Sequence, residues 1–265
     1  MNMKITLPDN SLRELPEGSS GYDLARDIGP GLAKSAVAIS VDGVQRDLHD
    51  VIEGDASVSI ITIDSDEGIE IMRHTLTAQV LARAIKKLYP KSKLAIGPTI
   101  DDGFYYDVES DQSISSDDLS KIEDEMKKII KTKSSITKKL VTKSEALDVF
   151  KENKESYKVE IVNESKQKNN FQLYYQDDKK FVDLCRGPHL PSLEFIGCFK
   201  LTKVSGAYWK GDSANAMLTR IYGTAFNNDK DLQSHLNNIE EAQKRDHRKL
   251  GKEMDLFHFQ DEAPG

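Results

Sequence analysis

The sequence predicts an α+β protein: a small β-rich unit followed by a larger unit of mixed helices and strands. Helical and strand-like segments do not alternate strictly along the chain, which disfavours a doubly wound parallel sheet. In the first unit, short apolar and β-branched runs surround the dipeptide Asp42-Gly43, a strong hairpin signal. Across residues 69–88, apolar side chains recur at helical spacing.

The first unit reads as a small sheet crossed by one helix. Strands are expected at the runs rich in aliphatic and β-branched residues, namely residues 5–7, 37–41, 45–48 and 58–62. Leu24, Ala25 and Ile28 share one face of a helix expected over residues 20–28. A Gly-Pro-Gly run at residues 29–31 is expected to end that helix.

In the larger unit, an acidic stretch at residues 64–67 indicates a linker, and a long helix over residues 69–88 follows it. A second helix is expected from about Asp117, with Ser116 as its N-cap. Other segments are expected as a short helix near residues 146–150, strands around Tyr105, Leu173, Val182, Leu201 and Leu218, and a last helix over residues 231–254. The basic end of that last helix is either a solvated face or an RNA-facing surface.

Composition limits the possible classes of protein. The 265 residues carry a net charge of −7, which argues against generic binding of nucleic acid but leaves room for a local basic patch. No run approaches the roughly 18 consecutive apolar residues of a membrane span. Two cysteines, Cys185 and Cys198, make no disulfide framework, so we expect a reducing, cytoplasmic location.

One short segment concentrates reactive side chains. Cys185 and His189 lie four residues apart across a Gly-Pro turn, directly after a strand-like run. A thiol and an imidazole brought together at a strand end can bind a metal or a polar ligand, or activate water. A buried core cysteine and an ordinary turn histidine would give the same short pattern.

The chain resembles the threonyl-tRNA synthetase family over essentially its whole length. The resemblance is carried by an ordered set of blocks at residues 73–75, 95–98, 102–107, 155–159, 183–189, 206–213, 220–225 and 244–251. It implies a β-grasp TGS domain at residues 1–63 and an editing domain at 64–226. Residues 227–265 would form a linker helix and the start of the class II catalytic domain. The ATP, Mg²⁺ and zinc sites and the homodimer contact belong to that catalytic domain in the family, so no cofactor or metal is expected in this segment.

For the editing domain, the resemblance implies hydrolysis of serine esterified to the 3′-adenosine at the acceptor end of threonine tRNA. Serine lacks only one methyl group, which is worth about 1–3 kcal/mol and is too little for faithful selection without a second site. The implied catalytic residues are Lys158, Cys185, His189 and His74. The implied substrate-binding residues are Asp183, Tyr106, Gln79 and Thr75, and the implied RNA-binding residues are Lys244, Arg245 and Arg248. For Tyr106, the alternative is a core aromatic residue.

The chain departs from the family at one place. The family normally carries His-x-x-x-His at the start of the first long helix. Counted from Arg73 the pair becomes His74 and Ala78, whereas counted back from residues 84–86 it becomes Thr75 and Gln79. The difference indicates a one-residue insertion and the loss of at least one histidine, and glutamine cannot act as a general base. Three interpretations stay open: an editing hydrolase, a non-catalytic tRNA-binding appendage with a degenerate site, and a zinc hydrolase built on His74, Cys185 and His189.

Overall fold

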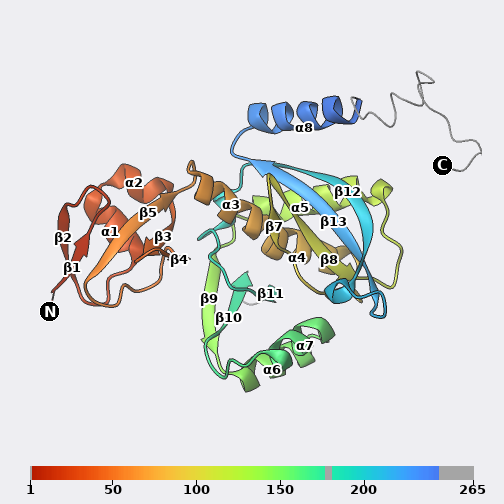
Figure 1. The fold of residues 1–265 in the computed structure, drawn as a ribbon, viewed down its shortest axis with the longest axis horizontal. Helices are drawn as coiled ribbons and strands as arrows, with labels where there is room; N and C mark the ends of the chain where they lie inside the picture. The colour runs from red at the N-terminus through yellow and green to blue at the C-terminus, as the bar shows by residue number, and fades with distance from the viewer. Residues whose placement is uncertain (1, 177–180, 245–265) are drawn as a thin grey trace, which may run out of the picture.

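The computed structural model describes residues 2–176 and 181–244, and its elements confirm the α+β class. The N-terminal unit consists of β1 (Asn2–Thr6), β2 (Leu12–Pro16), α1 (Gly21–Ile28), α2 (Pro30–Ser35), β3 (Ala36–Val41), β4 (Val44–Asp47) and β5 (Ala56–Thr62). Its strands form one mixed sheet in the order β2-β1-β5-β3-β4, in which β1 is parallel to β5. With α1 packed across this sheet, the unit is a β-grasp fold (Figure 1).

Local sequence explains the N-terminal elements. Ser20 and Asp23 form a reciprocal capping box at the start of α1. Asp42 and Gly43 both have positive φ, 49° and 82°, as a two-residue hairpin turn between β3 and β4 requires. The hairpin and the 20–28 helix are therefore confirmed. The sequence analysis missed α2, because Pro30 ends α1 but also suits the first turn of a new helix.

The second unit contains a main sheet, a smaller sheet and the helices that cover them. Its helices are α3 (Asp66–Thr75), η1 (Leu76–Leu81), α4 (Ala82–Leu88), η2 (Ser116–Asp118), α5 (Leu119–Lys131), α6 (Lys143–Glu152), α7 (Ser156–Glu164), η3 (Leu193–Phe195) and η4 (Trp209–Gly211). Its strands are β6 (Lys93–Leu94), β7 (Thr99–Ile100), β8 (Gly103–Glu109), β9 (Ile136–Val141), β10 (Phe171–Gln176), β11 (Phe181–Leu184), β12 (Cys198–Tyr208) and β13 (Met217–Phe226).

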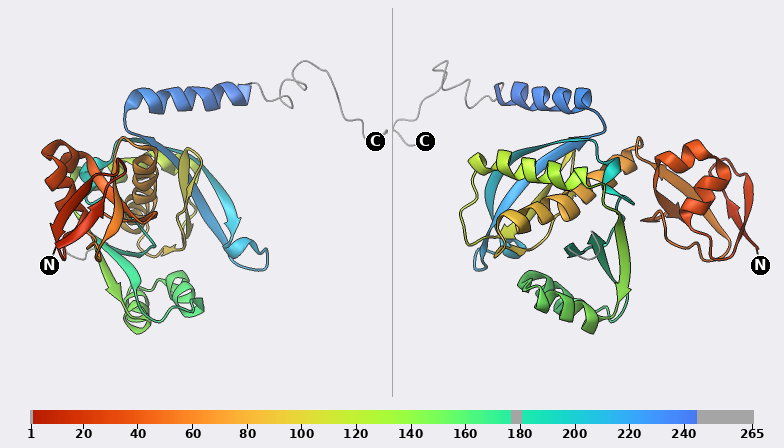
Figure 2. Two further views of the ribbon diagram at one scale, coloured as in Figure 1. Left: turned by 60° about the vertical axis from the view of Figure 1, so that its left-hand side comes forward. Right: turned by 180° about the vertical axis from the view of Figure 1, so that it is seen from behind.

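The two sheets stand side by side with the helices packed on them. The main sheet is antiparallel in the order β12-β13-β8-β6, and α3, α4 and α5 pack against it around one large apolar core. The smaller sheet has the order β11-β10-β9 and carries α6 and α7 on the side away from the N-terminal unit (Figures 1 and 2). The opposing strands β8 and β11 bring Tyr106 and Asp183 into contact, so a site forms between the sheets.

The long helix of residues 69–88 is present but not uniform. It runs from α3 through a π-helical segment, η1, into α4. A π-helical turn closes i→i+5 hydrogen bonds and so holds one residue more than an α-helical turn. The Gln176 side chain, in β10, donates a 2.7 Å hydrogen bond to the carbonyl oxygen of Gln79 within this turn.

Three helical segments differ from the sequence prediction. The cap before the second helix is Ser115 rather than Ser116, because a 3₁₀ turn, η2, precedes α5. Helix α7 was not expected, because its short segment lacks a clear apolar stripe. The last helix is α8 (Asp229–Lys244), which lies over β12 and β13 at the top of Figure 1, and the rest of the expected helix falls outside the described residues.

The two units meet directly at the junction between β5 and α3. Val37, Ala38 and Ile61 of the N-terminal sheet belong to the same buried apolar cluster as Ile71 and Met72 of α3. The N-terminal unit also has its own core, formed by α1 and the inner face of its sheet. The units therefore have separate cores joined by a shared apolar contact. Among the described residues, no helix is both long enough and apolar enough to cross a membrane.

Candidate functional site

A cavity of about 1050 Å³ lies between the two sheets of the second unit. One wall comes from His74 of α3 and Ala78 of η1, and another from Lys158 of α7. The end of β11 and the turn after it contribute Asp183 and Cys185. A cavity of this size lies at the upper end of the range for sites that bind small molecules.

His74 and Cys185 line this cavity, and the buried His189 lies next to them. His74 Nε2 lies 2.8 Å from Cys185 Sγ, and the His74 and His189 rings stack in parallel with centroids 4.6 Å apart. One donor atom from each of the three side chains lies within 4.8 Å of the others. Burial lowers the pKa of His74, partly opposed by the nearby Asp183 carboxylate. His74 is therefore a neutral imidazole near pH 7, able to accept a proton or to bind a metal.

Hydrogen bonding fixes which nitrogen of His189 carries the proton. The Thr75 hydroxyl donates to the Ile71 carbonyl oxygen at 2.8 Å, so it must accept from its other neighbours. Those neighbours are the Leu190 N–H at 3.0 Å and His189 Nδ1 at 3.1 Å. His189 thus carries its hydrogen on Nδ1, and its buried Nε2 has no partner in the protein among the described residues. That lone pair is available to a water molecule or a metal ion beside His74 and Cys185.

Lys158 and Asp183 form a buried ion pair beside this cluster. Lys158 Nζ lies 2.6 Å from Asp183 Oδ1, and both side chains are less than 5% exposed. Burial raises the pKa of the Asp183 carboxyl, while the Lys158 ammonium works against that increase. The Leu184 N–H donates to the same carboxylate at 2.8 Å, and the Tyr106 hydroxyl donates to Oδ2 at 3.3 Å. The pair therefore holds the Lys158 ammonium group at the cavity wall.

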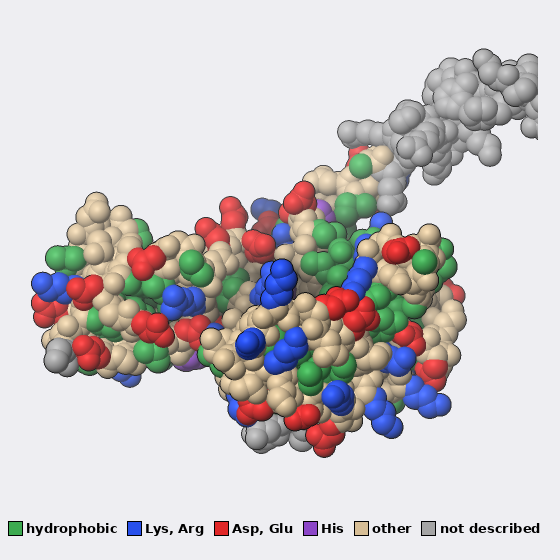
Figure 3. Space-filling view, turned by 60° about the horizontal axis from the view of Figure 1, so that its bottom comes forward, with side chains coloured by type: hydrophobic (Ala, Val, Ile, Leu, Met, Phe, Trp, Pro, Cys, Tyr) green, Lys and Arg blue, Asp and Glu red, His purple; other side chains and the backbone are tan. Residues whose placement is uncertain are grey.

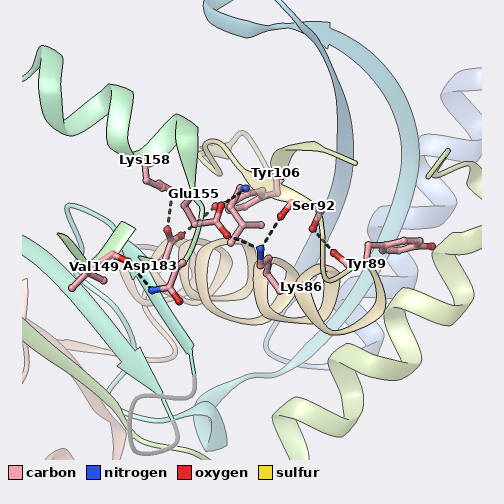
Figure 4. A network of polar contacts seen from close by, with 10 residues as sticks. Lys86, Tyr89, Ser92, Tyr106, Val149, Glu155, Lys158 and Asp183 are labelled. Carbon is pink, nitrogen blue, oxygen red and sulfur yellow. Dashed lines mark hydrogen bonds and ion pairs between the residues drawn. The ribbon is translucent and has the colours of Figure 1, made fainter. Parts of the chain in front are cut away.

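A second ion pair anchors the helix that carries Lys158. Glu155 precedes α7, lies 2.7 Å from Lys86 Nζ, and accepts the Leu94 N–H at 2.7 Å. Figure 4 shows Lys158 one helical turn further on, directed from α7 toward Asp183. Because Glu155 is bound to both α4 and β6, the start of α7 is fixed relative to the cavity.

Three of the expected substrate-binding residues do not reach the cavity. Tyr106 is 1% exposed, and its hydroxyl donates to Asp183. Gln79 is fully buried and accepts a 2.9 Å hydrogen bond from Gln176, and Thr75 is buried against His189. A direct contact between these three side chains and a substrate stays a prediction. In this structure they contact residues of the site and its surrounding core.

The two ways of counting the altered histidine pair name residues that lie differently. His74 and Ala78 both line the cavity. Thr75 and Gln79 are fully buried and are not among the residues that line it. A π-helical segment, η1, begins two residues after His74 and contains both Ala78 and Gln79.

The expected RNA-binding residues lie far along the chain from this cluster. Lys244 ends α8, is exposed, and lies 2.7 Å from Glu240 Oε1. Arg245 and Arg248 lie outside the described residues. On the face drawn in Figure 3, Lys and Arg side chains gather over the second unit, whereas Asp and Glu predominate on the N-terminal unit.

The cavity also contains residues that the sequence analysis did not single out as binding residues. Ile96, Gly97 and Pro98 line it opposite α7, and Gln172 and Arg186 line its other side. Trp209, expected as a packing residue, lines the cavity as well, with its Nε1 donating to Glu160 at 3.1 Å. For these positions other than Gln172, the sequence signal was their place within the family blocks, and Gln172 lies in none of those blocks.

Comparisons with known proteins agree with this architecture. The TGS domain family matches residues 3–62, and the family described as "Threonyl and Alanyl tRNA synthetase second additional domain" matches residues 172–222. Over 261 residues the chain is 51% identical to a threonine–tRNA ligase of Hahella chejuensis. The match covers 98% of this chain and 40% of the relative, so the chain spans about two fifths of that enzyme's length. The chain is therefore similar to part of a threonine–tRNA ligase and carries matches to two domain families.

Proposed function

We propose that this segment hydrolyses serine wrongly esterified to threonine tRNA. The observation that carries the proposal is the convergence of His74, Cys185 and His189 beside the buried Lys158–Asp183 pair, at the wall of one large cavity. Ester hydrolysis needs a positioned water, a group that takes its proton, and a positive charge for the developing oxyanion or leaving group. The two clusters provide these three functions.

The roles follow from the protonation states. His74 is neutral and lies at the cavity, so it accepts the proton of the attacking water, which Cys185 and the His189 Nε2 lone pair help to hold. Lys158 has two N–H donors left after its bond to Asp183, and these stabilise the oxyanion or protonate the ribose oxygen as it leaves. Among the described residues, Asp183 Oδ2 accepts one long hydrogen bond, from Tyr106, and we expect it to accept a further bond from the amino group of the serine ester.

The test is deacylation of threonine tRNA charged with serine, measured with the complete 265-residue chain. We expect hydrolysis of the seryl ester, slower hydrolysis of the threonyl ester, and loss of both rates in His74→Ala. A chain that binds the tRNA but leaves the seryl ester intact would overturn the proposal. That result would instead favour the tRNA-binding appendage, which the alanine at position 78 already makes a coherent alternative.

A zinc-dependent form of the same hydrolysis is the second candidate. It is favoured by the three donor atoms of His74, Cys185 and His189 within 4.8 Å of one another, since one cysteine and two histidines are a zinc ligand set that leaves an open position. A bound zinc would lower the pKa of a water molecule. Elemental analysis of purified protein, with zinc titration followed by calorimetry, decides this point: absence of stoichiometric binding would exclude it.

The tRNA partner and the wider enzyme are part of the same proposal. We expect the acceptor end of threonine tRNA to enter the cavity, with Lys244, Arg245 and Arg248 contacting phosphates. Neutralising these three should reduce the salt dependence of tRNA binding by up to about 3 units of slope. An unchanged slope would show that the basic run is only solvated. Ligation, with its ATP, Mg²⁺ and zinc, the homodimer and the cytoplasmic location are proposals for the longer enzyme.

A further inference from the structure

The N-terminal unit reaches the candidate site through one carboxylate. Asp47 ends β4, and its side chain is only 15% exposed. Its oxygens accept hydrogen bonds from three donors of the second unit: the His189 backbone N–H at 2.8 Å, the Tyr174 hydroxyl at 2.8 Å and Lys138 Nζ at 2.8 Å. This carboxylate therefore joins the N-terminal unit to three separate segments of the second unit.

Each of these contacts bears on the turn that carries His189. The bond to the His189 N–H fixes the backbone of that residue. The Tyr174 ring lies edge-on to the His189 ring, with centroids 4.4 Å apart, and its hydroxyl occupies the space that a Cβ on Gly187 would enter. Thr75 holds Nδ1 of the same imidazole from the other side. His189 is therefore held at its backbone from the N-terminal unit and at its ring from α3.

The charge of Asp47 is balanced locally. Burial would lower the pKa of Lys138, but Asp47 and Asp50 outweigh burial and raise it. Lys138 thus stays cationic and bridges the two carboxylates, lying 2.5 Å from an Asp50 oxygen. Among the described residues, the Asp50 side chain makes no hydrogen bond with His189 or Tyr174, although it shares Lys138 with Asp47. Both aspartates bind Lys138, but of the two only Asp47 is bonded to His189 and Tyr174, so Asp50 serves as a control for Asp47.

We propose that Asp47 is a positioning residue through which the β-grasp unit holds His189 in register with His74 and Cys185. This rests on the proposed hydrolysis, whose reacting groups it aligns. The β-grasp unit is then part of the hydrolytic site as well as a neighbouring domain. The carboxylate acts only through the Cys185–His189 turn, since Asp47 itself does not line the main cavity.

The experiment compares Asp47→Ala with Asp50→Ala in the complete chain. Asp47→Ala should lower kcat for seryl-tRNA hydrolysis roughly 10- to 100-fold with little change in KM, because the histidine is displaced and tRNA contacts are not. Asp50→Ala should stay within about twofold of the wild type. Asp47→Asn keeps an oxygen that accepts the His189 N–H and should recover most of the rate. If Asp47→Ala does not fold, Asp47→Ser, which is too short to reach that N–H, replaces it.

A second readout does not depend on hydrolysis. The ¹⁵N signals of the His189 ring should show the Nδ1–H tautomer in the wild type and in Asp50→Ala, and an averaged tautomer in Asp47→Ala. Equal kcat values for the two alanine variants, or a His189 spectrum that is unchanged in Asp47→Ala, would overturn the positioning role. If the wild-type chain does not hydrolyse seryl-tRNA, the proposed function fails, and the ring spectrum alone decides whether Asp47 holds His189.

Discussion

Two clusters meet at the cavity, and they differ in how completely their polar groups are satisfied. The Lys158–Asp183 pair is almost wholly buried, and each partner neutralises the other. In the other cluster, His74 is neutral and lines the cavity with Cys185, and among the described residues the His189 Nε2 lone pair has no partner. A buried charge without a partner is strongly destabilising, whereas a single buried lone pair without a partner costs much less. The first cluster is therefore expected to contribute to stability as well as to the proposed chemistry, and the second mainly to the chemistry.

The largest expected effect is from Lys158→Ala. It should destabilise the chain by about 3–5 kcal/mol, because it leaves Asp183 buried without its counter-charge, and it should also abolish hydrolysis. The double variant Lys158→Met with Asp183→Asn should regain most of the stability while hydrolysis stays lost. Urea unfolding and deacylation measured on both variants give the answer. If the single and double variants were equally stable, the loss of stability in Lys158→Ala would not come from the unpaired charge of Asp183.

In the other cluster, His74→Ala should separate activity from stability. Removing a proton-transfer group typically costs about 10²–10⁴-fold in rate. Because His74 is only partly buried and carries no buried charge, we expect stability to change by about 1 kcal/mol or less. Rates and urea midpoints are measured on the same preparations. A stability loss as large as that of Lys158→Ala would show that the histidine cluster is structural.

Restoring the missing histidine should sharpen the comparison. Ala78 faces the cavity four residues after His74, so Ala78→His should raise the rate of seryl-tRNA hydrolysis about tenfold or more. Gln79→His is the matched control, because Gln79 lies in the core and bonds to Gln176. That control should lose about 1–3 kcal/mol of stability and gain no activity. A gain in Gln79→His alone would mean that the helix is rotated from the position described.

The smallest expected effect is in the pH dependence of stability. Since burial lowers the pKa of His74, the unfolded chain binds more protons just below the ordinary histidine pKa of about 6.5. The contribution of His74 is therefore complete above about pH 6.5 and is lost as the pH falls through its folded pKa. His74→Asn should flatten this part of the stability curve, and the exposed His49→Asn should not. If the two variants had identical curves of stability against pH, the conclusion that His74 is neutral in the folded protein would be wrong.

The fold was largely predictable because its signals are local. The Asp42-Gly43 hairpin, the helix at residues 20–28 and the long apolar stripe of residues 69–88 all depend on neighbouring residues, and all are present. Helix α7 was not recoverable from periodicity, because it is short and is held in place by Glu155. Within the site, the chemical types of side chain were evident, but the side of the helix on which Thr75 and Gln79 lie was not.

The sequence alone determined the α+β class, the β-grasp unit, and the presence of a thiol and an imidazole at the end of a strand. It also predicted a one-residue departure near the histidine pair of the family that it resembles. Only the tertiary structure showed that a π-helical turn lies at this place, and that Ala78, unlike Gln79, lines the cavity. Only the tertiary structure joined Asp47 to His189, which are 142 residues apart. Such a contact has no local signature, because it exists only once two separately patterned units have packed together.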